Sequence, residues 1–363
     1  MNHRYLRLGW LVACFLLLSG CADTHYVMRL DPDGSAGQVR KVWPQPPETP
    51  RYAYVGELTG ENNFHDENEQ QRSAGMKFLY WLVGLTAGNR EPVVLQRPVS
   101  GMVDGQGRIL VTDASRRAVF VFDGVAGKLD VWDQAKENVR FESPVGIAPG
   151  PNGQILVADA KLGEVIRLDS AGNPVGSFGK GILKWPTGLA RDGKRGRVFV
   201  VDTYAHDIKV FDDAGKLLDV IGRRGTGPGE FNFPTHLALA DGKLYVADTL
   251  NSRVQVLDEH GGFLRQFGER GLYVGNMVRP KGVAVDSDNN VYVVESMHDY
   301  LLVFNRDGRF LMPIGGTGKK IGEFYLPAGA WTDPHNRIYV ADMFNGRVVI
   351  FQYLTGMKHA QKN

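Results

Sequence analysis

One unit of 42 to 48 residues occurs six times along the sequence, and this repeat limits the possible folds of the chain more than any other feature. Each copy contains short runs rich in Val, Leu, Tyr and Phe, separated by Gly, Asp or Asn. Such runs indicate β-strands joined by tight turns. Each copy also opens with a proline: Pro98, Pro144, Pro186, Pro234, Pro280 and Pro327. The repeat therefore predicts similar small sheets that cover one another's apolar faces.

An acidic residue ends the second strand of every copy: Asp113, Asp159, Asp202, Asp248, Glu295 and Asp342. Because all six copies have it, we expect its side chain to accept hydrogen bonds from backbone N–H groups of the following turn. The alternative is a ring of carboxylates that binds a cation. The glycine-rich segments 225–229 and 315–318 are expected to be turns and not phosphate loops, since no helix follows them.

The sixth copy stops after its third strand, at Phe351. The segment 51–64 resembles the fourth-strand segment 217–231, so we expect an N-terminal strand to complete the last sheet and close a ring. The prediction is an all-β, six-bladed β-propeller over residues 51–353, followed by a tail at 354–363. An apolar stretch at about 74–86 predicts a short helical insert, which either packs on the domain or contacts a membrane.

The repeated pattern also resembles a known family. Pro-x-Gly-Val-Ala-Val, Tyr-Val-Ala-Asp-Thr-x-Asn-x-Arg-Val and Phe-Gly-x-x-Gly-x-Gly-x-Gly-x-Phe are similar to the NHL repeat, over about residues 51–353. In the peptide-amidating lyases, which such a propeller resembles, zinc-binding histidines directly follow the opening prolines. None of the equivalent residues here is a histidine: Val99, Val145, Thr187, Thr235, Lys281 and Ala328. The resemblance therefore implies the fold and not that active site.

The N-terminus has the pattern of an export signal. Two arginines precede an apolar run at 8–18, which is too short to span a bilayer. Leu18-Ser19-Gly20-Cys21 resembles the bacterial lipobox. We therefore expect residues 1–20 to be removed, Cys21 to carry the lipid anchor and 21–50 to form a Pro-rich spacer. Ala22 favours the outer membrane, on its periplasmic or surface face, and leaves the inner membrane open.

The net charge of the chain limits the kinds of molecule that it is expected to bind. The chain has 42 basic and 40 acidic residues, and loss of Arg4 and Arg7 with the signal would balance them. A neutral mature chain argues against nucleic-acid binding. Cys14 and Cys21 are the two cysteines, so neither a disulfide framework nor a cysteine metal site is expected. The expected partners are the membrane, through Cys21, and an envelope protein or a small ligand. No cofactor is expected.

Candidate binding residues are those on the turns or at positions where one copy departs from the others. His236, for example, stands where four copies have Gly, and Trp331 stands where four have Ala. His206, His236 and His298 come from successive copies and are candidates to converge on a ligand or metal. The full set is Tyr204, His206, His236, Arg253, His298, Asn345 and Arg347. The favoured function is a non-catalytic, lipid-anchored envelope scaffold; the alternative is a metal-dependent hydrolase or lyase.

Overall fold

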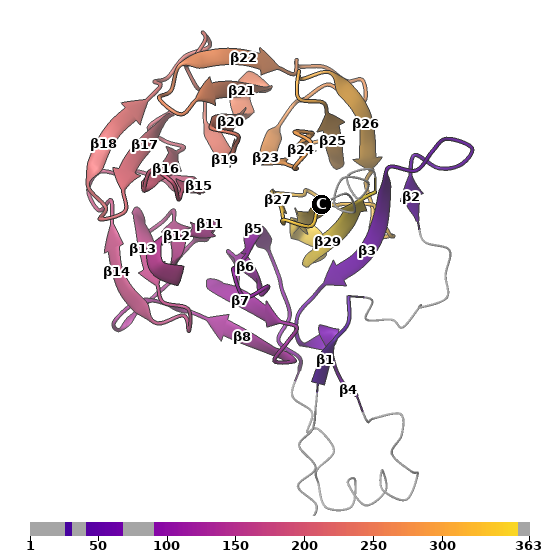
Figure 1. Ribbon diagram of the computed structural model, residues 1–363, viewed down its shortest axis with the longest axis horizontal. Helices are drawn as coiled ribbons and strands as arrows, with labels where there is room; N and C mark the ends of the chain where they lie inside the picture. The colour runs from indigo at the N-terminus through magenta and orange to yellow at the C-terminus, as the bar shows by residue number, and fades with distance from the viewer. Residues whose placement is uncertain (1–25, 31–40, 68–90, 355–363) are drawn as a thin grey trace, which may run out of the picture.

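The computed structural model describes residues 26–30, 41–67 and 91–354, which form a ring of six antiparallel sheets (Figure 1). These residues contain no α-helix, only four short 3₁₀ turns. The expected six-bladed, all-β propeller is confirmed. The export signal with Cys21, the predicted insert at 74–86 and the tail after Leu354 lie outside the described residues.

Each of the first five blades has four strands, ordered from the axis outward as they follow along the chain. Blade 1 consists of β5 (Pro98–Val103), β6 (Ile109–Asp113), β7 (Ala118–Asp123) and β8 (Lys128–Trp132). Blade 2 consists of β11 (Pro144–Pro149), β12 (Ile155–Asp159), β13 (Glu164–Leu168) and β14 (Pro174–Phe178). A short pair, β9 (Gln134–Lys136) and β10 (Val139–Arg140), connects these two blades.

Blades 3 to 5 repeat this order. Blade 3 consists of β15 (Pro186–Asp192), β16 (Arg197–Asp202), β17 (Asp207–Asp212) and β18 (Leu217–Ile221). Blade 4 consists of β19 (Pro234–Ala240), β20 (Lys243–Asp248), β21 (Arg253–Asp258) and β22 (Phe263–Phe267). Blade 5 consists of β23 (Pro280–Val285), β24 (Val291–Glu295), β25 (Tyr300–Phe304) and β26 (Phe310–Gly315).

Blade 6 combines both ends of the described chain. Its inner strands are β27 (Ala330–Thr332), β28 (Arg337–Asp342) and β29 (Arg347–Tyr353). The N-terminal strand β3 (Tyr52–Leu58) pairs antiparallel with β29 and occupies the fourth position that the sequence assigned to it. An ion pair of 2.8 Å between Arg347 Nη1 and Glu57 Oε2 joins the same two strands.

Part of the segment expected to be a spacer lies on the propeller. Strand β1 (Tyr26–Met28) pairs with β4 (Phe64–Asp66), and β2 (Val42–Trp43) adds a fifth strand outside β3. The Trp43 ring packs edge-on against Phe351, with 5.3 Å between centroids. The expected spacer at 21–50 therefore needs correction: its described residues, 26–30 and 41–50, include strands of the folded domain.

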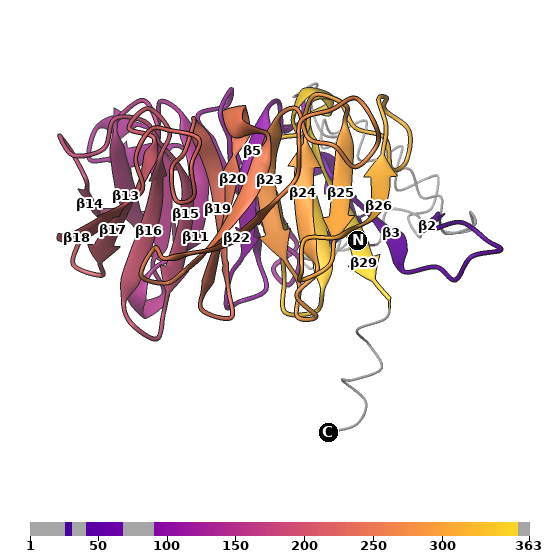
Figure 2. The same cartoon turned by 90° about the horizontal axis from the view of Figure 1, so that it is seen from above.

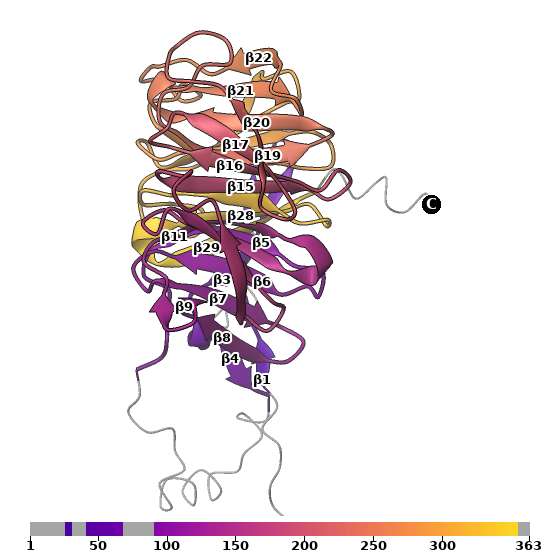
Figure 3. The same ribbon diagram turned by 90° about the vertical axis from the view of Figure 1, so that its left-hand side faces the viewer.

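The core is divided among the six interfaces between neighbouring blades. Each of six hydrophobic clusters takes side chains from two adjacent blades, so that every blade is covered on both faces. The cluster between blades 6 and 1, for example, includes Leu58, Ile350 and Phe120, all fully buried. Burial on both faces explains why the second and third strands are almost continuously apolar. In the edge-on views, the sheets stand side by side and their turns form two opposite faces (Figures 2 and 3).

Candidate functional site

One face of the disc carries most of the residues proposed from the sequence. Because the strands of a blade are antiparallel, turns from the second to the third strand share this face with loops that enter the next blade. We call it the turn face. The six second-strand acids lie at its base and are completely buried.

Those acids have the structural role expected of them. Asp159 accepts four backbone N–H bonds: from Glu142 and Ser143 in the entering loop, and from Lys161 and Leu162 in the turn. Glu295 accepts the same set in blade 5, from Val278, Arg279, Met297 and His298. Asp113 accepts the same set in blade 1, so in these three blades the acid joins the turn to the entering loop by charge-assisted hydrogen bonds. The side chains of Asp202, Asp248 and Asp342 accept backbone N–H bonds from the entering loop alone.

The exposed side chains two residues after these acids differ around the ring. In blades 3 to 6 they are large and apolar: Tyr204, Leu250, Met297 and Phe344, each 48 to 56% exposed. In blades 1 and 2 they are Ser115 and Lys161. We call the four large side chains the apolar arc. Sequence reasoning selected Tyr204 and missed the others, although their shared position after the acid was a usable signal.

Aromatic contacts hold both ends of the apolar arc. Tyr204 stacks on Trp185 with ring centroids 4.9 Å apart, and Phe344 meets Tyr325 edge-on at 5.8 Å. These partners come from the entering loops of the same blades. The two ends of the arc are therefore ordered by the protein itself.

Three of the predicted binding residues are part of the scaffold. The Arg253 guanidinium is buried; its Nε donates to Asp248 and its Nη2 to the backbone oxygens of Gly227 and Glu230. Arg347 makes the equivalent bonds in blade 6, to Asp342 and to the backbone oxygen of Glu323. Asn345 donates to the backbone oxygen of Gly318 and to Asp342. These contacts leave no free donor face for a partner, so the binding interpretation of Arg253 and Arg347 is corrected.

The three candidate histidines do not converge. His206 Nδ1 accepts the backbone N–H of Phe233 at 3.1 Å, and burial followed by the Arg224 charge lowers the pKa of His206. His298 Nδ1 lies 3.0 Å from the Glu295 carboxylate. Over the described ranges, no three His, Cys, Asp or Glu side chains are grouped as a metal site requires.

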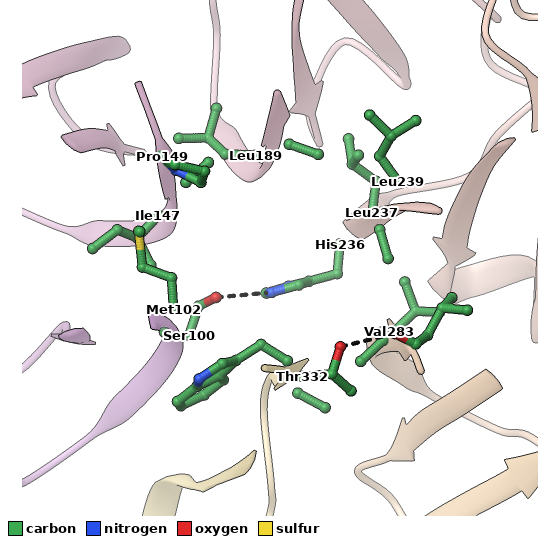
Figure 4. Close-up of a pocket in the computed structure, with 18 of the residues that line it drawn as sticks. Ser100, Met102, Ile147, Pro149, Leu189, His236, Leu237, Leu239, Val283 and Thr332 are labelled. Carbon is green, nitrogen blue, oxygen red and sulfur yellow. Dashed lines mark hydrogen bonds between the residues drawn. The ribbon is translucent and has the colours of Figure 1, made fainter. Parts of the chain in front are cut away.

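His236 lies on the axis instead. Its Nε2 is 3.1 Å from Ser100 Oγ, which belongs to β5 of the opposite blade (Figure 4). We call this hydrogen bond the crossbar. Burial, together with the Lys281 charge, lowers the pKa of His236 to about 4. His236 is therefore neutral at physiological pH.

Glycines at the same level let the inner strands approach closely. A Cβ at Gly146 would lie 2.0 Å from the Thr187 backbone oxygen, and one at Gly329 would lie 2.3 Å from that of Val99. A side chain at Gly146 or Gly329 would therefore clash with the neighbouring strand. At the equivalent positions of two other blades, the side chains of Ser100 and His236 point across the axis (Figure 4). The departure of His236 from its siblings was a correct signal that this position is special.

An axial cavity of about 320 Å³ adjoins the crossbar. Most of its lining is apolar, including Met102, Ile147, Leu189 and Val283 (Figure 4). Trp331 also lines it and stacks on Tyr339 at 5.3 Å; its buried Nε1 has no hydrogen-bond partner.

Within the described ranges there is no helix of sufficient length and apolarity to cross a bilayer.

Comparisons with known proteins agree with this architecture. A family model described as a six-bladed beta-propeller, DUF5128, matches residues 192–240 and 285–362, and the NHL repeat model matches 231–257. No curated protein matches the sequence.

Solved structures with this fold include enzymes. Virginiamycin B lyase from Staphylococcus aureus is 14% identical, with a TM-score of 0.52 over 71% of this chain and 96% of its own. A gluconolactonase from Xanthomonas campestris is 16% identical, with a TM-score of 0.55 over 72% of this chain and 90% of its own. At such identities only the fold is shared. The sheet order shows that this chain is a six-bladed β-propeller, and the two family models match parts of it.

Proposed function

We propose that this propeller is a non-catalytic binding scaffold of the bacterial cell envelope and that its turn face holds a protein partner. The apolar arc is the observation that carries the proposal. Four large apolar side chains from successive blades are about half exposed at one position of the repeat. A face on which four neighbouring blades each present a large apolar side chain can bury apolar surface against a partner, as protein-binding sites do.

The rigidity of the turn face supports the same role. Buried acids hold the entering loops by backbone N–H bonds, and aromatic contacts hold Tyr204 and Phe344. A surface that is ordered before binding loses less conformational entropy when a partner docks. The lipobox-like motif at Cys21 adds the proposed address: a tethered scaffold at the outer membrane.

The alternative, a metal-dependent hydrolase or lyase, has less support. The candidate histidines have separate hydrogen-bond partners, and the described chain offers no cluster of metal-ligating side chains. The enzymes with similar folds share too little sequence to carry an activity to this chain.

Site-directed photo-crosslinking in intact cells tests the proposal. We expect a photoreactive residue at Leu250 or Met297 to capture the same envelope protein. Leu218 is the matched control, because it is as exposed as Leu250 but lies on β18 at the outer edge of blade 3. Capture of the same species from all three positions, or from none, would refute a partner on the turn face.

A further inference from the structure

Lys281 occupies a distinctive place at the axial end of the turn face. It directly follows the strand-opening Pro280, and it is charged whereas the five equivalent residues of the other copies are uncharged. The β23–β24 register shifts between Pro280 and Gly282, so Lys281 is the extra residue of a β-bulge. Bulges re-aim a side chain and are frequent beside binding sites.

The Lys281 ammonium is partly buried without a counter-ion. In the described parts of the chain, no carboxylate pairs with it and no hydrogen bond uses it. A desolvated cation without a partner costs free energy, which an incoming anion recovers. The backbone oxygen of Lys281 accepts a hydrogen bond from Thr235 Oγ1 at 2.8 Å, which fixes the strand at this point.

Two arginines add positive charge beside Lys281. Arg279 and Arg97 each precede a strand-opening proline, of β23 and β5 respectively. The Arg97 guanidinium lies 5.3 Å from the centre of the Phe344 ring, and neither arginine forms an ion pair within the described chain. Burial first, and then the charges of Arg279 and Arg97, lower the pKa of Lys281.

The acids nearest to this trio are already engaged. Glu295 accepts the Arg279 backbone N–H at 2.6 Å, and Asp113 accepts that of Arg97 at 2.9 Å. Both carboxylates are completely buried and also hold the adjacent turns. His236, the other titratable group near Lys281, is neutral at physiological pH. The three basic side chains therefore offer unpaired positive charge to the turn-face side of the axis.

We propose that Lys281, Arg279 and Arg97 form a carboxylate-binding site at the axis, and that an acidic segment of the protein partner occupies it. The inference rests on the proposed function and deepens it by naming the chemistry of the partner. Phe344 lies beneath Arg97, and Met297 follows Ser296, whose hydroxyl donates to the Arg279 backbone oxygen. The basic trio thus adjoins the apolar arc, and the complementary ligand is a peptide with acidic and apolar side chains.

Peptide binding to the full chain, purified in detergent, tests this site. The probe is a short fluorescent peptide of alternating Glu and Phe, with the matched Gln and Phe peptide as control. Measured by fluorescence anisotropy at low salt, the Glu peptide is expected to bind roughly tenfold more tightly than the Gln peptide. Added salt should remove most of that difference, because it screens exposed charges.

Variants that remove one positive charge test whether the Glu peptide binds at Lys281 and Arg279. Lys281→Gln and Arg279→Gln should each weaken binding of the Glu peptide severalfold, and Lys281→Arg should retain it. Lys216→Gln is the matched control, because Lys216 is exposed on a turn of the opposite face. Urea unfolding of Lys281→Gln should show no loss of stability, since the substitution removes an unpaired cation.

Two results would overturn the inference: equal binding of both peptides, or binding of the Glu peptide that survives Lys281→Gln and Arg279→Gln together. Complete displacement of the peptide by inorganic phosphate, with no contribution from its Phe residues, would also overturn it and indicate a site for small anions. If crosslinks from Leu250 and Met297 still capture one partner in any of these cases, the proposed function stands without the carboxylate site.

Discussion

His236, which departs from the repeat, and Arg253, which belongs to its common pattern, behave differently at the scale of single residues. Both were candidate binding residues. Arg253 is buried in a hydrogen-bond network within its own blade, whereas His236 crosses the axis to Ser100. Arg253 strengthens the scaffold, and His236 marks the centre of the propeller.

The crossbar predicts a specific dependence of stability on pH. The pKa of His236 is about 4 in the folded protein and near 6.5 when the side chain is solvated. Between these values the unfolded chain binds the extra proton, so the free energy of unfolding falls as the pH falls. We expect His236 to account for about 2 kcal/mol of lost stability between pH 7 and pH 5.

Urea unfolding of the wild type and of His236→Gln at both pH values measures this contribution. Glutamine is neutral and retains a hydrogen-bonding group toward Ser100. The variant should lose less stability than the wild type over the interval, because the other titrating groups are common to both proteins. Equal losses would mean that His236 accepts its proton without cost in the folded state.

At this scale the sequence predicted some roles and not others. The structural role of the six acids was predictable, because a side chain that occurs in every copy is expected to stabilise the backbone structure that all copies share. The role of Arg253 was not, because its acceptors, Gly227 and Glu230, lie in a loop more than 20 residues away. A binding role for Lys281 was not predictable, because its environment depends on Arg279 and on Arg97, which lies in another copy of the repeat.

Among the strands, β3 has the greatest influence on the fold. It supplies the fourth strand of a blade whose other strands come from the far end of the chain. Its pairing with β29 runs from Leu58 opposite Val348 to Tyr52 opposite Tyr353. The sequence predicted this pairing because 51–64 resembles the fourth-strand segments of other copies. It did not predict β1 and β2, which are too short to produce a periodic pattern.

The burial of Leu58 makes the contribution of β3 measurable. Leu58 is completely buried in the cluster shared by blades 6 and 1. Leu58→Ala is expected to lower the free energy of unfolding by about 2–5 kcal/mol, from lost burial and the remaining cavity. Leu218→Ala on the outer strand β18 should change it by less than about 0.5 kcal/mol, because Leu218 is half exposed. Similar midpoints in urea would contradict a closing role for β3.

For the whole molecule, the distribution of the core determines how the ring unfolds. Every hydrophobic cluster belongs to two blades, so no blade keeps a complete core when a neighbour opens. The six-bladed architecture was predictable for the same reason: each copy has two apolar faces and needs a neighbour on each side. Lipidation of Cys21, the insert at 74–86 and the envelope address remain predictions from sequence.

This shared core predicts one cooperative unfolding transition. Far-ultraviolet circular dichroism and tryptophan fluorescence should give the same midpoint in urea, and Leu58→Ala should shift both equally. Trp331 lies in the cluster shared by blades 6 and 1, together with Leu58 of the closing strand, and Trp132 lies in the next cluster, between blades 1 and 2. Their fluorescence therefore reports on this part of the ring. An earlier fluorescence transition, with the circular dichroism signal intact, would show that blade 6 opens on its own.

The order of strands before β3 has a mechanical consequence. A pull on the N-terminal side of the chain reaches β1 first, then β2, and only then the strand that completes blade 6. The ladders β1–β4 and β2–β3 are short, so they would peel away in turn at low force. If Cys21 anchors the chain, these short ladders would open under tension before the pairing of β3 with β29 that completes the ring.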